Sequence, residues 1–282
     1  MAEQIYNLKI IECGSRMEIY KYQGYVTTGK ESTNATGRGG KAELSEEQKA
    51  NNKKDSRVKV LNEARNKIVR LISCNPDMQT FITITYKDNF QDLKKSKEHI
   101  RIFFKKLRVD YPNIKYLYVL EFQERGAIHY HILSNIKIDI PMCRSKKSQK
   151  QKDLENYFKK HYWSNRGFVD IRRLDIEGIS NVAKYVSAYL VKDLLSIDLQ
   201  GNKIYGYSKN LNKPKVTTIE TKDNTMKYFK LEGYNLQYSN SYERVYINKE
   251  GKEVRSQVNY FDYLKENSNE DWNINPNSKD RA

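Results

Sequence analysis

The chain has 282 residues and carries 51 Lys and Arg against 35 Asp and Glu, a formal net charge of +16 at pH 7. This length allows one or two domains, and no apolar run approaches the ~18 residues of a spanning helix, which excludes a helical membrane protein. The three cysteines are scattered and match neither a disulfide framework nor a zinc site, so we expect a reducing, cytoplasmic setting. The charge favours polyanionic partners, of which nucleic acid is the commonest in a cytoplasm.

The pattern of apolar and polar residues changes twice in the N-terminal part of the chain. Residues 5–28 alternate apolar and polar side chains, which predicts two strands. Residues 29–56 are rich in Gly, Ser, Asn, Lys and Glu without periodicity, so we expect strands followed by a flexible linker over residues 1–56. A periodic pattern begins again at residue 57, where apolar residues at helical spacing predict a helix that ends at Asn75-Pro76-Asp77.

Strands and helices alternate in the middle of the chain, and we expect one domain over residues 57–200. After the first helix, the patterns predict strand, helix, strand, strand, helix, strand and helix over residues 81–86, 91–109, 116–122, 127–133, 144–166, 168–174 and 179–195. An antiparallel central sheet with helices packed on it, an α+β fold, is the simplest arrangement of these elements. Residues 201–282 form a strand-rich extension with a hairpin turn at residues 248–252 and a frayed tail.

Two of the four histidines stand in His129-Tyr130-His131. Alternate residues of a strand share one face, so both imidazoles lie side by side. If the loop before this strand has three residues, with Gly126 in the left-handed conformation, Glu121 lies opposite His129 on that face. One carboxylate and two imidazoles suit Mg²⁺ or Mn²⁺ with positions left for phosphate oxygens and water. A two-residue loop would weaken the assignment of Glu121, and two partly exposed histidines on a sheet face are the alternative without a metal.

A second candidate lies in the helix expected over residues 179–195. Tyr185 and Tyr189 are four residues apart and share one helix face, which Lys192 joins three residues later. A phenol of pKa about 10 acts as a nucleophile only when a metal, a base or a nearby cation activates it, and Lys192 supplies a candidate cation. The chain has 22 tyrosines, so two residues at the edge of a core are the alternative interpretation.

Three motifs follow one another in a diagnostic order: a strand Phe81-x-Thr83-x-Thr85-Tyr86, a hairpin Glu121…Gly126-x-x-His129-x-His131, and a helix Tyr185-x-x-x-Tyr189-x-x-Lys192. Together they resemble the HUH endonuclease superfamily. More closely, they resemble the rolling-circle replication initiator (Rep) proteins of small phages and plasmids, including those of Gram-positive bacteria. The resemblance covers residues 57–195, about half of the chain.

The resemblance implies a five-stranded antiparallel sheet of RRM-like form, the HUH fold. It implies that His129, His131 and Glu121 bind the metal. Tyr189 with Lys192 fits the family's Tyr-x-x-Lys motif, and Tyr185 stands where two-tyrosine members keep their other tyrosine. Those members often have a lysine at the position of Ala188. This departure favours Tyr189 as the main nucleophile, with Tyr185 as second or auxiliary.

The implied activity is metal-dependent nicking and rejoining of single-stranded or hairpin DNA at a replication origin in a bacterial cytoplasm. The tyrosine forms a 5′-phosphotyrosine, and the free 3′-hydroxyl primes a host polymerase. No phosphate loop of Walker spacing occurs, so unwinding needs a host helicase. A relaxase or transposase of the same chemistry, a non-catalytic RRM-like nucleic-acid-binding protein and a water-using phosphohydrolase remain alternatives. The sequence does not predict an oligomeric state.

A basic stretch with interleaved aromatic residues is the candidate DNA-binding surface. Basic side chains track phosphates, and aromatic rings stack on bases. The alternative is an amphipathic helix with a solvated lysine face and a buried aromatic face. The residues expected to bind DNA are Lys146, Lys147, Lys159, Lys160, Trp163 and Arg172.

Overall fold

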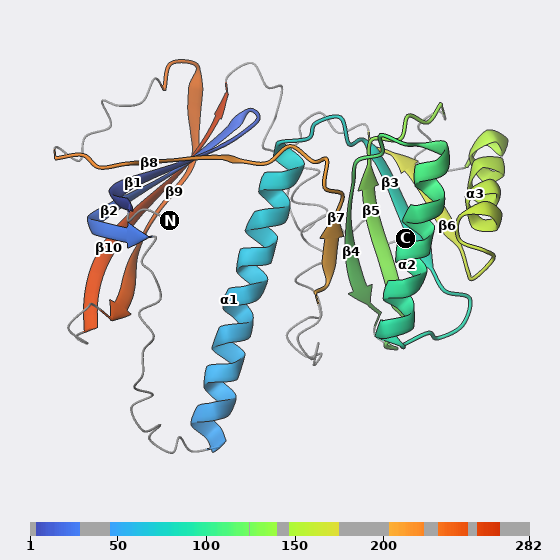
Figure 1. Ribbon diagram of the computed structural model, residues 1–282, viewed down its shortest axis with the longest axis horizontal. Coiled ribbons are helices and arrows are strands. Elements are labelled where there is room, and N and C mark those ends of the chain that lie inside the picture. The colour runs from blue at the N-terminus through green and yellow to red at the C-terminus, as the bar shows by residue number, and fades with distance from the viewer. Residues whose placement is uncertain are drawn as a thin grey trace. The chain divides into compact units, whose positions relative to one another are not determined.

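The computed structural model describes residues 4–28, 46–123, 125–139, 147–174, 203–222, 231–247 and 253–265. The chain divides into two compact units. The first consists of Met1–Asn75 and Asn212–Asn267, and the second of Pro76–Leu211 and Ser268–Ala282. Each unit contains a five-stranded antiparallel sheet (Figure 1), which confirms the α+β class. In the part of the chain that the structure describes, no helix is long and apolar enough to cross a membrane.

The sheet of the first unit joins the two flanks of the chain. Its strand order is β8-β1-β2-β10-β9, with β1 Gln4–Cys13, β2 Arg16–Thr28, β8 Lys215–Ile219, β9 Tyr234–Ile247 and β10 Glu253–Lys265. The alternation in residues 5–28 correctly predicted β1 and β2. Glu253 pairs with Ile247, which confirms the expected hairpin of β9 and β10, although its turn lies outside the described residues. The two flanks therefore form one sheet, whereas the sequence placed them in separate regions.

Helix α1 spans Glu46–Ser73, so the linker expected over residues 29–56 was wrong from Glu46 onward. That part of the helix consists mainly of Glu, Gln, Lys, Ala and Asn. Several of these residues form helices well but leave no apolar periodicity to detect. α1 belongs to the first unit, where Arg70 binds the buried Glu18 of β2 through a 2.6 Å contact between Nη2 and Oε2. The first helix of the expected central domain thus lies with the flanks.

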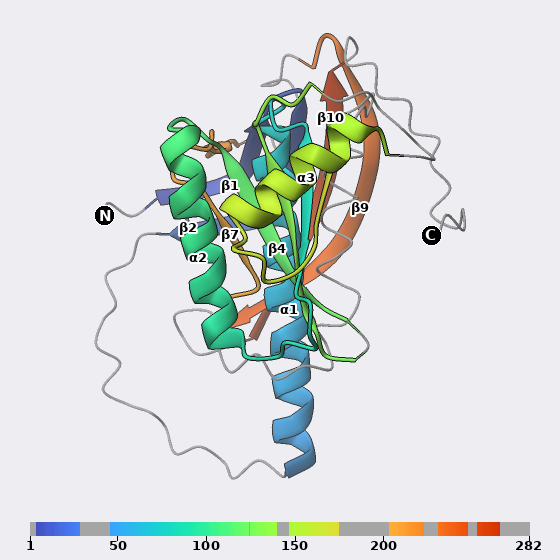
Figure 2. The ribbon, with the colours of Figure 1, turned by 90° about the vertical axis from the view of Figure 1, so that its right-hand side faces the viewer.

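The second unit contains the expected central sheet, in the order β6-β3-β5-β4-β7. Helices α2 and α3 lie over the same face of this sheet (Figure 2). Ser148 caps the N-terminus of α3 by accepting from the Gln151 N–H, so this helix is shorter than the stretch expected over residues 144–166. The elements are β3 Thr80–Thr85, α2 Leu93–Asp110, β4 Tyr116–Phe122, β5 Ile128–Ser134, α3 Gln149–His161, β6 Val169–Arg173 and β7 Tyr205–Tyr207.

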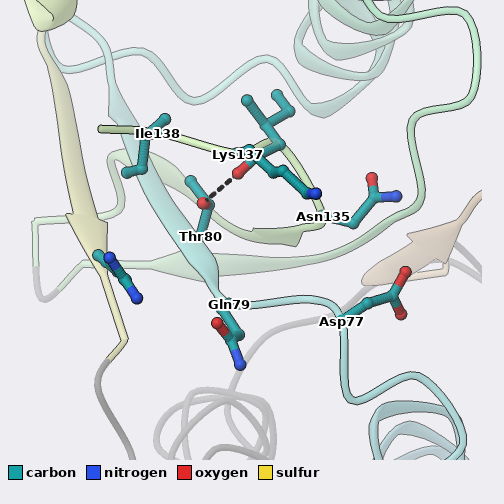
Figure 3. Close-up of a pocket in the computed structure, with 8 residues that line it drawn as sticks. Asp77, Gln79, Thr80, Asn135, Lys137 and Ile138 are labelled. Carbon is teal, nitrogen blue, oxygen red and sulfur yellow. Dashed lines mark hydrogen bonds between the residues drawn. The ribbon is translucent and has the colours of Figure 1, made fainter. Parts of the chain in front are cut away.

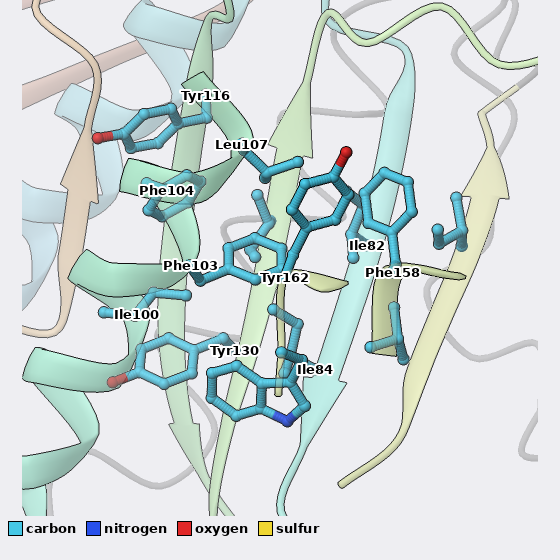
Figure 4. Close-up of a cluster of buried hydrophobic side chains, with 14 of the residues drawn as sticks. Ile82, Ile84, Ile100, Phe103, Phe104, Leu107, Tyr116, Tyr130, Phe158 and Tyr162 are labelled. Carbon is cyan, nitrogen blue, oxygen red and sulfur yellow. The ribbon is translucent and has the colours of Figure 1, made fainter. Parts of the chain in front are cut away.

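The core of the second unit lies between the sheet and its two helices (Figure 4). Alternate residues of the central strands, including Ile82, Ile84 and Tyr130, point toward aromatic residues of α2 and α3 such as Phe103 and Phe158. Tyr130 is fully buried, and its hydroxyl lies 2.6 Å from Ser96 Oγ on α2. One face of each central strand is therefore committed to the core, and the residues between belong to the opposite face.

Candidate active site

The hairpin of β4 and β5 sets the register of the candidate site. Gly126 has φ 82°, a left-handed conformation that a side chain disfavours. Its N–H donates to Gln123 O at 2.7 Å, and the Gln123 N–H donates to Ala127 O at 2.9 Å. Glu121 therefore pairs with His129 across the strands. This is the register that the three-residue loop predicted.

The two histidines lie on the sheet face opposite the core. His129 and His131 alternate with buried Ile128, Tyr130 and Ile132, as the strand pattern predicted. On the neighbouring strand β3, Thr85 pairs with His129 and Thr83 pairs with His131. The face thus presents imidazoles, hydroxyls and one carboxylate from three adjacent strands.

Side-chain contacts centre on His131. Its Nε2 lies 2.6 Å from Glu121 Oε2, a contact diagonal to the backbone register. Its Nδ1 lies 3.3 Å from Thr83 Oγ1. With the proton on Nε2, the ring donates to the carboxylate and accepts from the threonine hydroxyl. Both ring nitrogens are therefore held, and the plane of the imidazole is oriented from two strands.

The pKa of His129 is lowered to about 4, first because burial penalises its charged form and then because His131 lies close. The carboxylate of Glu121 opposes this shift without cancelling it. His129 is therefore neutral at neutral pH, which is the form of imidazole that binds metal ions.

The chemical types of these donor groups suit a divalent cation. Glu121 offers a carboxylate, and His129 and His131 offer imidazole nitrogens, a mixed set suited to Mn²⁺ or Mg²⁺. A metal-bound Nε2 of His131 would place the proton on Nδ1, where the Thr83 hydroxyl can accept it, the usual arrangement behind a histidine ligand. Among the described residues, no three His, Cys, Asp or Glu side chains already form a metal cluster. The structure thus shows a hydrogen-bonded pair of candidate ligands with a third on the same face.

Residues 79–194 match the model of a family described as replication-associated protein ORF2. The match covers less than half of the chain, and over this segment the protein is similar to that replication-associated family. The matched segment contains Glu121, His129 and His131, and also the candidate tyrosines. A comparison with curated proteins finds no match, and a comparison with solved structures finds none either.

The candidate nucleophiles of the replication-associated segment are not among the described residues. Tyr185, Tyr189 and Lys192 fall between residues 174 and 203, as does the helix expected over residues 179–195. Their roles stay predictions from the motif.

The basic residues expected to bind DNA lie in different settings. Lys147 forms ion pairs with Asp170 at 2.5 Å and Glu155 at 2.8 Å; burial lowers its pKa, but these two carboxylates outweigh burial and raise it. Arg172 pairs with Asp170 at 2.9 Å. Lys160 is exposed to solvent, and the Lys159 ammonium lies over the ring of Phe168. Lys146 lies outside the described residues.

The structure contradicts the expectation that Trp163 stacks on DNA bases. Its side chain is fully buried, and Nε1 donates to Thr85 O at 3.0 Å. Phe158 and Tyr162 are buried in the same core, whereas Tyr157 of α3 is 45% exposed. The alternative interpretation of this basic stretch is therefore correct for Phe158, Tyr162 and Trp163.

Two residues near the site were assigned no role from the sequence. Thr83 orients His131, and Phe168 is an aromatic side chain that is 64% exposed beside Thr85. The alternation of Phe81-x-Thr83-x-Thr85 could have placed both threonines on one face. Only the pairing of β3 with β5 shows which histidine each one meets.

A separate pocket of about 420 Å³ lies at the opposite end of β3 and β5 (Figure 3). Amide, hydroxyl and basic side chains line it, including Gln79, Thr80 and Lys137, without histidine. Its carboxylate, Asp77, pairs with Lys115 at 3.0 Å. This pocket therefore lacks the donor set of the Glu121 face.

Proposed function

We propose that the protein initiates rolling-circle DNA replication by nicking and rejoining one DNA strand at an origin. The replication-associated family whose model matches residues 79–194 supports a role in replication initiation. The observation that carries the chemistry is the contact between His131 and Glu121, with His129 on the same sheet face. A carboxylate and two imidazoles side by side suit a site that binds a metal and a phosphodiester.

The proposed reaction uses a tyrosine as the nucleophile. The Tyr189 hydroxyl oxygen forms a bond to the scissile phosphorus, the bond from phosphorus to the 3′-oxygen breaks, and the phenol proton ends on that oxygen. The products are a 5′-phosphotyrosine and a free 3′-hydroxyl, and the reverse reaction rejoins the strand without ATP. A Mg²⁺ or Mn²⁺ ion held by Glu121, His129 and His131 would neutralise charge on the phosphate. Lys192 would favour the phenolate, and Tyr185 would act as a second nucleophile.

A cleavage assay tests this proposal. The protein is incubated with Mn²⁺ and end-labelled single-stranded oligonucleotides that tile its own genetic element, and the products are separated on a denaturing SDS gel. We expect a slower, protease-sensitive labelled band that Tyr189→Phe and His131→Ala abolish. His161→Ala is the matched control, because this exposed histidine lies on α3 away from the hairpin.

The other outcomes separate the alternatives. Loss of the band only in Tyr185→Phe would keep the reaction and change the nucleophile. Cleavage without a covalent band would point to water as the nucleophile, and binding without cleavage of any oligonucleotide would favour a non-catalytic protein. If nicking occurs but the element replicates normally with Tyr189→Phe, mobilisation or transposition replaces replication as the role. The free 3′ end would otherwise serve a host polymerase, with a host helicase to unwind.

A further inference from the structure

A groove of about 1100 Å³ lies in the first unit between α1 and strands β2, β9 and β10. All of its lining residues fall outside residues 79–194, so the replication-associated family does not account for it. One wall is the tyrosine-bearing sheet face, and the other is the middle of α1, around residues 58–66.

The sheet wall presents four tyrosines from three adjacent strands: Tyr20, Tyr238, Tyr242 and Tyr260. The ring centroids of Tyr20 and Tyr260 are 4.9 Å apart, and those of Tyr260 and Tyr238 are 6.2 Å apart. Tyr238 and Tyr242 of β9 are 53% and 44% exposed. Tyr20, Tyr260 and Tyr238 therefore form a row of rings, and the two exposed tyrosines of β9 are open to a ligand.

The helix wall is polar where it meets the groove. Five of the six α1 residues that line it are polar or charged, and Val58 is the one apolar residue among them, while Leu61 of the same helix is buried. The five are Lys59, Asn62, Glu63, Arg65 and Asn66. A helix that simply packed on this sheet would turn apolar residues toward it. Amide and cationic side chains opposite aromatic rings indicate a binding groove.

The charge of the groove favours an anionic ligand. Glu18 at its base is neutralised by Arg70, whose Nη2 lies 2.6 Å from Oε2. Of the remaining charged residues, Lys59 and Arg65 are basic and Glu63 is acidic. With Arg70 counted against Glu18, one positive charge remains in excess around the groove, in a chain of net charge +16.

We propose that this groove binds unpaired nucleotides of single-stranded DNA, with bases stacked on Tyr238 and Tyr242 and phosphates near Lys59 and Arg65. Rows of exposed aromatic rings beside basic side chains suit single strands, whose bases offer free faces, and they bind without sequence preference. The choice of DNA as the ligand rests on the proposed replication function, because nicking and strand displacement produce a single strand. Binding in the groove does not itself require nicking.

Fluorescence anisotropy with a labelled oligothymidylate, which lacks an origin sequence, tests the proposal on the full chain. We expect Tyr238→Ala and Tyr242→Ala each to weaken binding about fivefold or more, since stacking on an aromatic side chain is lost. Tyr238→Phe should bind within about twofold of the wild type, because the ring remains. Val245→Ala is the matched control: this residue of β9 is 51% exposed but faces the other side of the sheet.

Photocrosslinking gives a readout that does not depend on the stability of a variant. An oligonucleotide with iodinated deoxyuridine is irradiated on the wild-type chain, and the peptides are mapped by mass spectrometry. We expect adducts on the β9 peptide that contains Tyr238 and Tyr242. Adducts confined to residues 76–211, or unchanged affinity in both alanine variants, would overturn the proposal. The proposal would also be overturned if the alanine variants sedimented differently from the wild type but bound DNA with the same affinity. The groove would then be occupied by a second copy of the chain.

The nicking assay separates this inference from the proposed function. If the wild type never nicks but the tyrosine variants lose oligothymidylate binding, the groove stands and the proposed function fails. If nicking depends on Tyr189 but Tyr238→Ala and Tyr242→Ala bind normally, the function stands and the groove fails.

Discussion

Replacement of Trp163 tests whether α3 uses its aromatic residues for the core or for DNA. The side chain is fully buried, with its ring centroid 5.0 Å from that of Tyr86 and 6.1 Å from that of Phe103. Burial of ~200 Å² at ~25 cal/mol per Å² amounts to about 5 kcal/mol, and the hydrogen bond to Thr85 O adds about 1 kcal/mol. We expect Trp163→Ala to lower the free energy of unfolding by about 3–5 kcal/mol. Trp163→Phe, which keeps a ring, should cost roughly 2 kcal/mol.

The effect should be local to the second unit. Hydrogen exchange followed by mass spectrometry on the full chain should show faster exchange in β3, α2 and α3, while peptides of β1 and β10 stay unchanged. Tyr157→Ala on the same helix is the control, because Tyr157 is an exposed aromatic residue. If Trp163→Ala left exchange unchanged but weakened DNA binding as the loss of a stacking residue would, the burial argument would be refuted.

Three further predictions each follow from one side chain. Thr83→Val should lower Mn²⁺ affinity about 10- to 100-fold in calorimetry, because the hydroxyl that orients His131 is lost, whereas Thr83→Ser should retain it. Arg70→Met should lower the free energy of unfolding of the first unit by about 3–5 kcal/mol in urea, because Glu18 is left buried without its main partner. Burial lowers the pKa of His99 below 6.5, so its folded form resists protonation and stability falls as the pH drops below that value. His99→Gln should therefore lose less stability than the wild type between about pH 7.5 and about pH 5, measured by Trp fluorescence.

Each of these predictions has its own control. Equal Mn²⁺ binding by Thr83→Val and the wild type would show that the hydroxyl does not position the ligand. The double variant Arg70→Met with Glu18→Gln should be more stable than Arg70→Met alone, since no unpaired buried charge remains. An identical pH dependence for wild type and His99→Gln would rule out this histidine as a source of acid sensitivity.

Local rules predicted the parts of the site that depend on neighbouring residues in the chain. The alternation of His129, Tyr130 and His131 assigned each side chain to its face. Gly126 predicted the turn, and the turn predicted that Glu121 would pair with His129. A hairpin register follows from a few consecutive residues, so no knowledge of the remaining fold was needed.

Pairings between distant segments could not be predicted in the same way. Strand β2 pairs with β10, where Tyr20 meets Tyr260, and no local pattern indicates which of several strands will be neighbours. The contact of Thr83 with His131 was not predicted for the same reason, because it depends on the pairing of β3 with β5. The burial of Trp163 could not be predicted from a local rule either. An amphipathic pattern shows which residues share a helix face but not whether that face packs inward.

The geometry of the candidate metal ligands depends on the core behind them. The residue between the two histidines, Tyr130, is fully buried, and its hydroxyl meets Ser96 of α2 at 2.6 Å. Any shift of β5 that moved His129 and His131 toward or away from Glu121 would also pull Tyr130 out of this contact. A bulky residue between two ligands on a strand thus holds both at a set height above the sheet. For this reason the middle position of the His-x-His motif belongs to the candidate site as much as the two histidines do, although its side chain is buried on the core face.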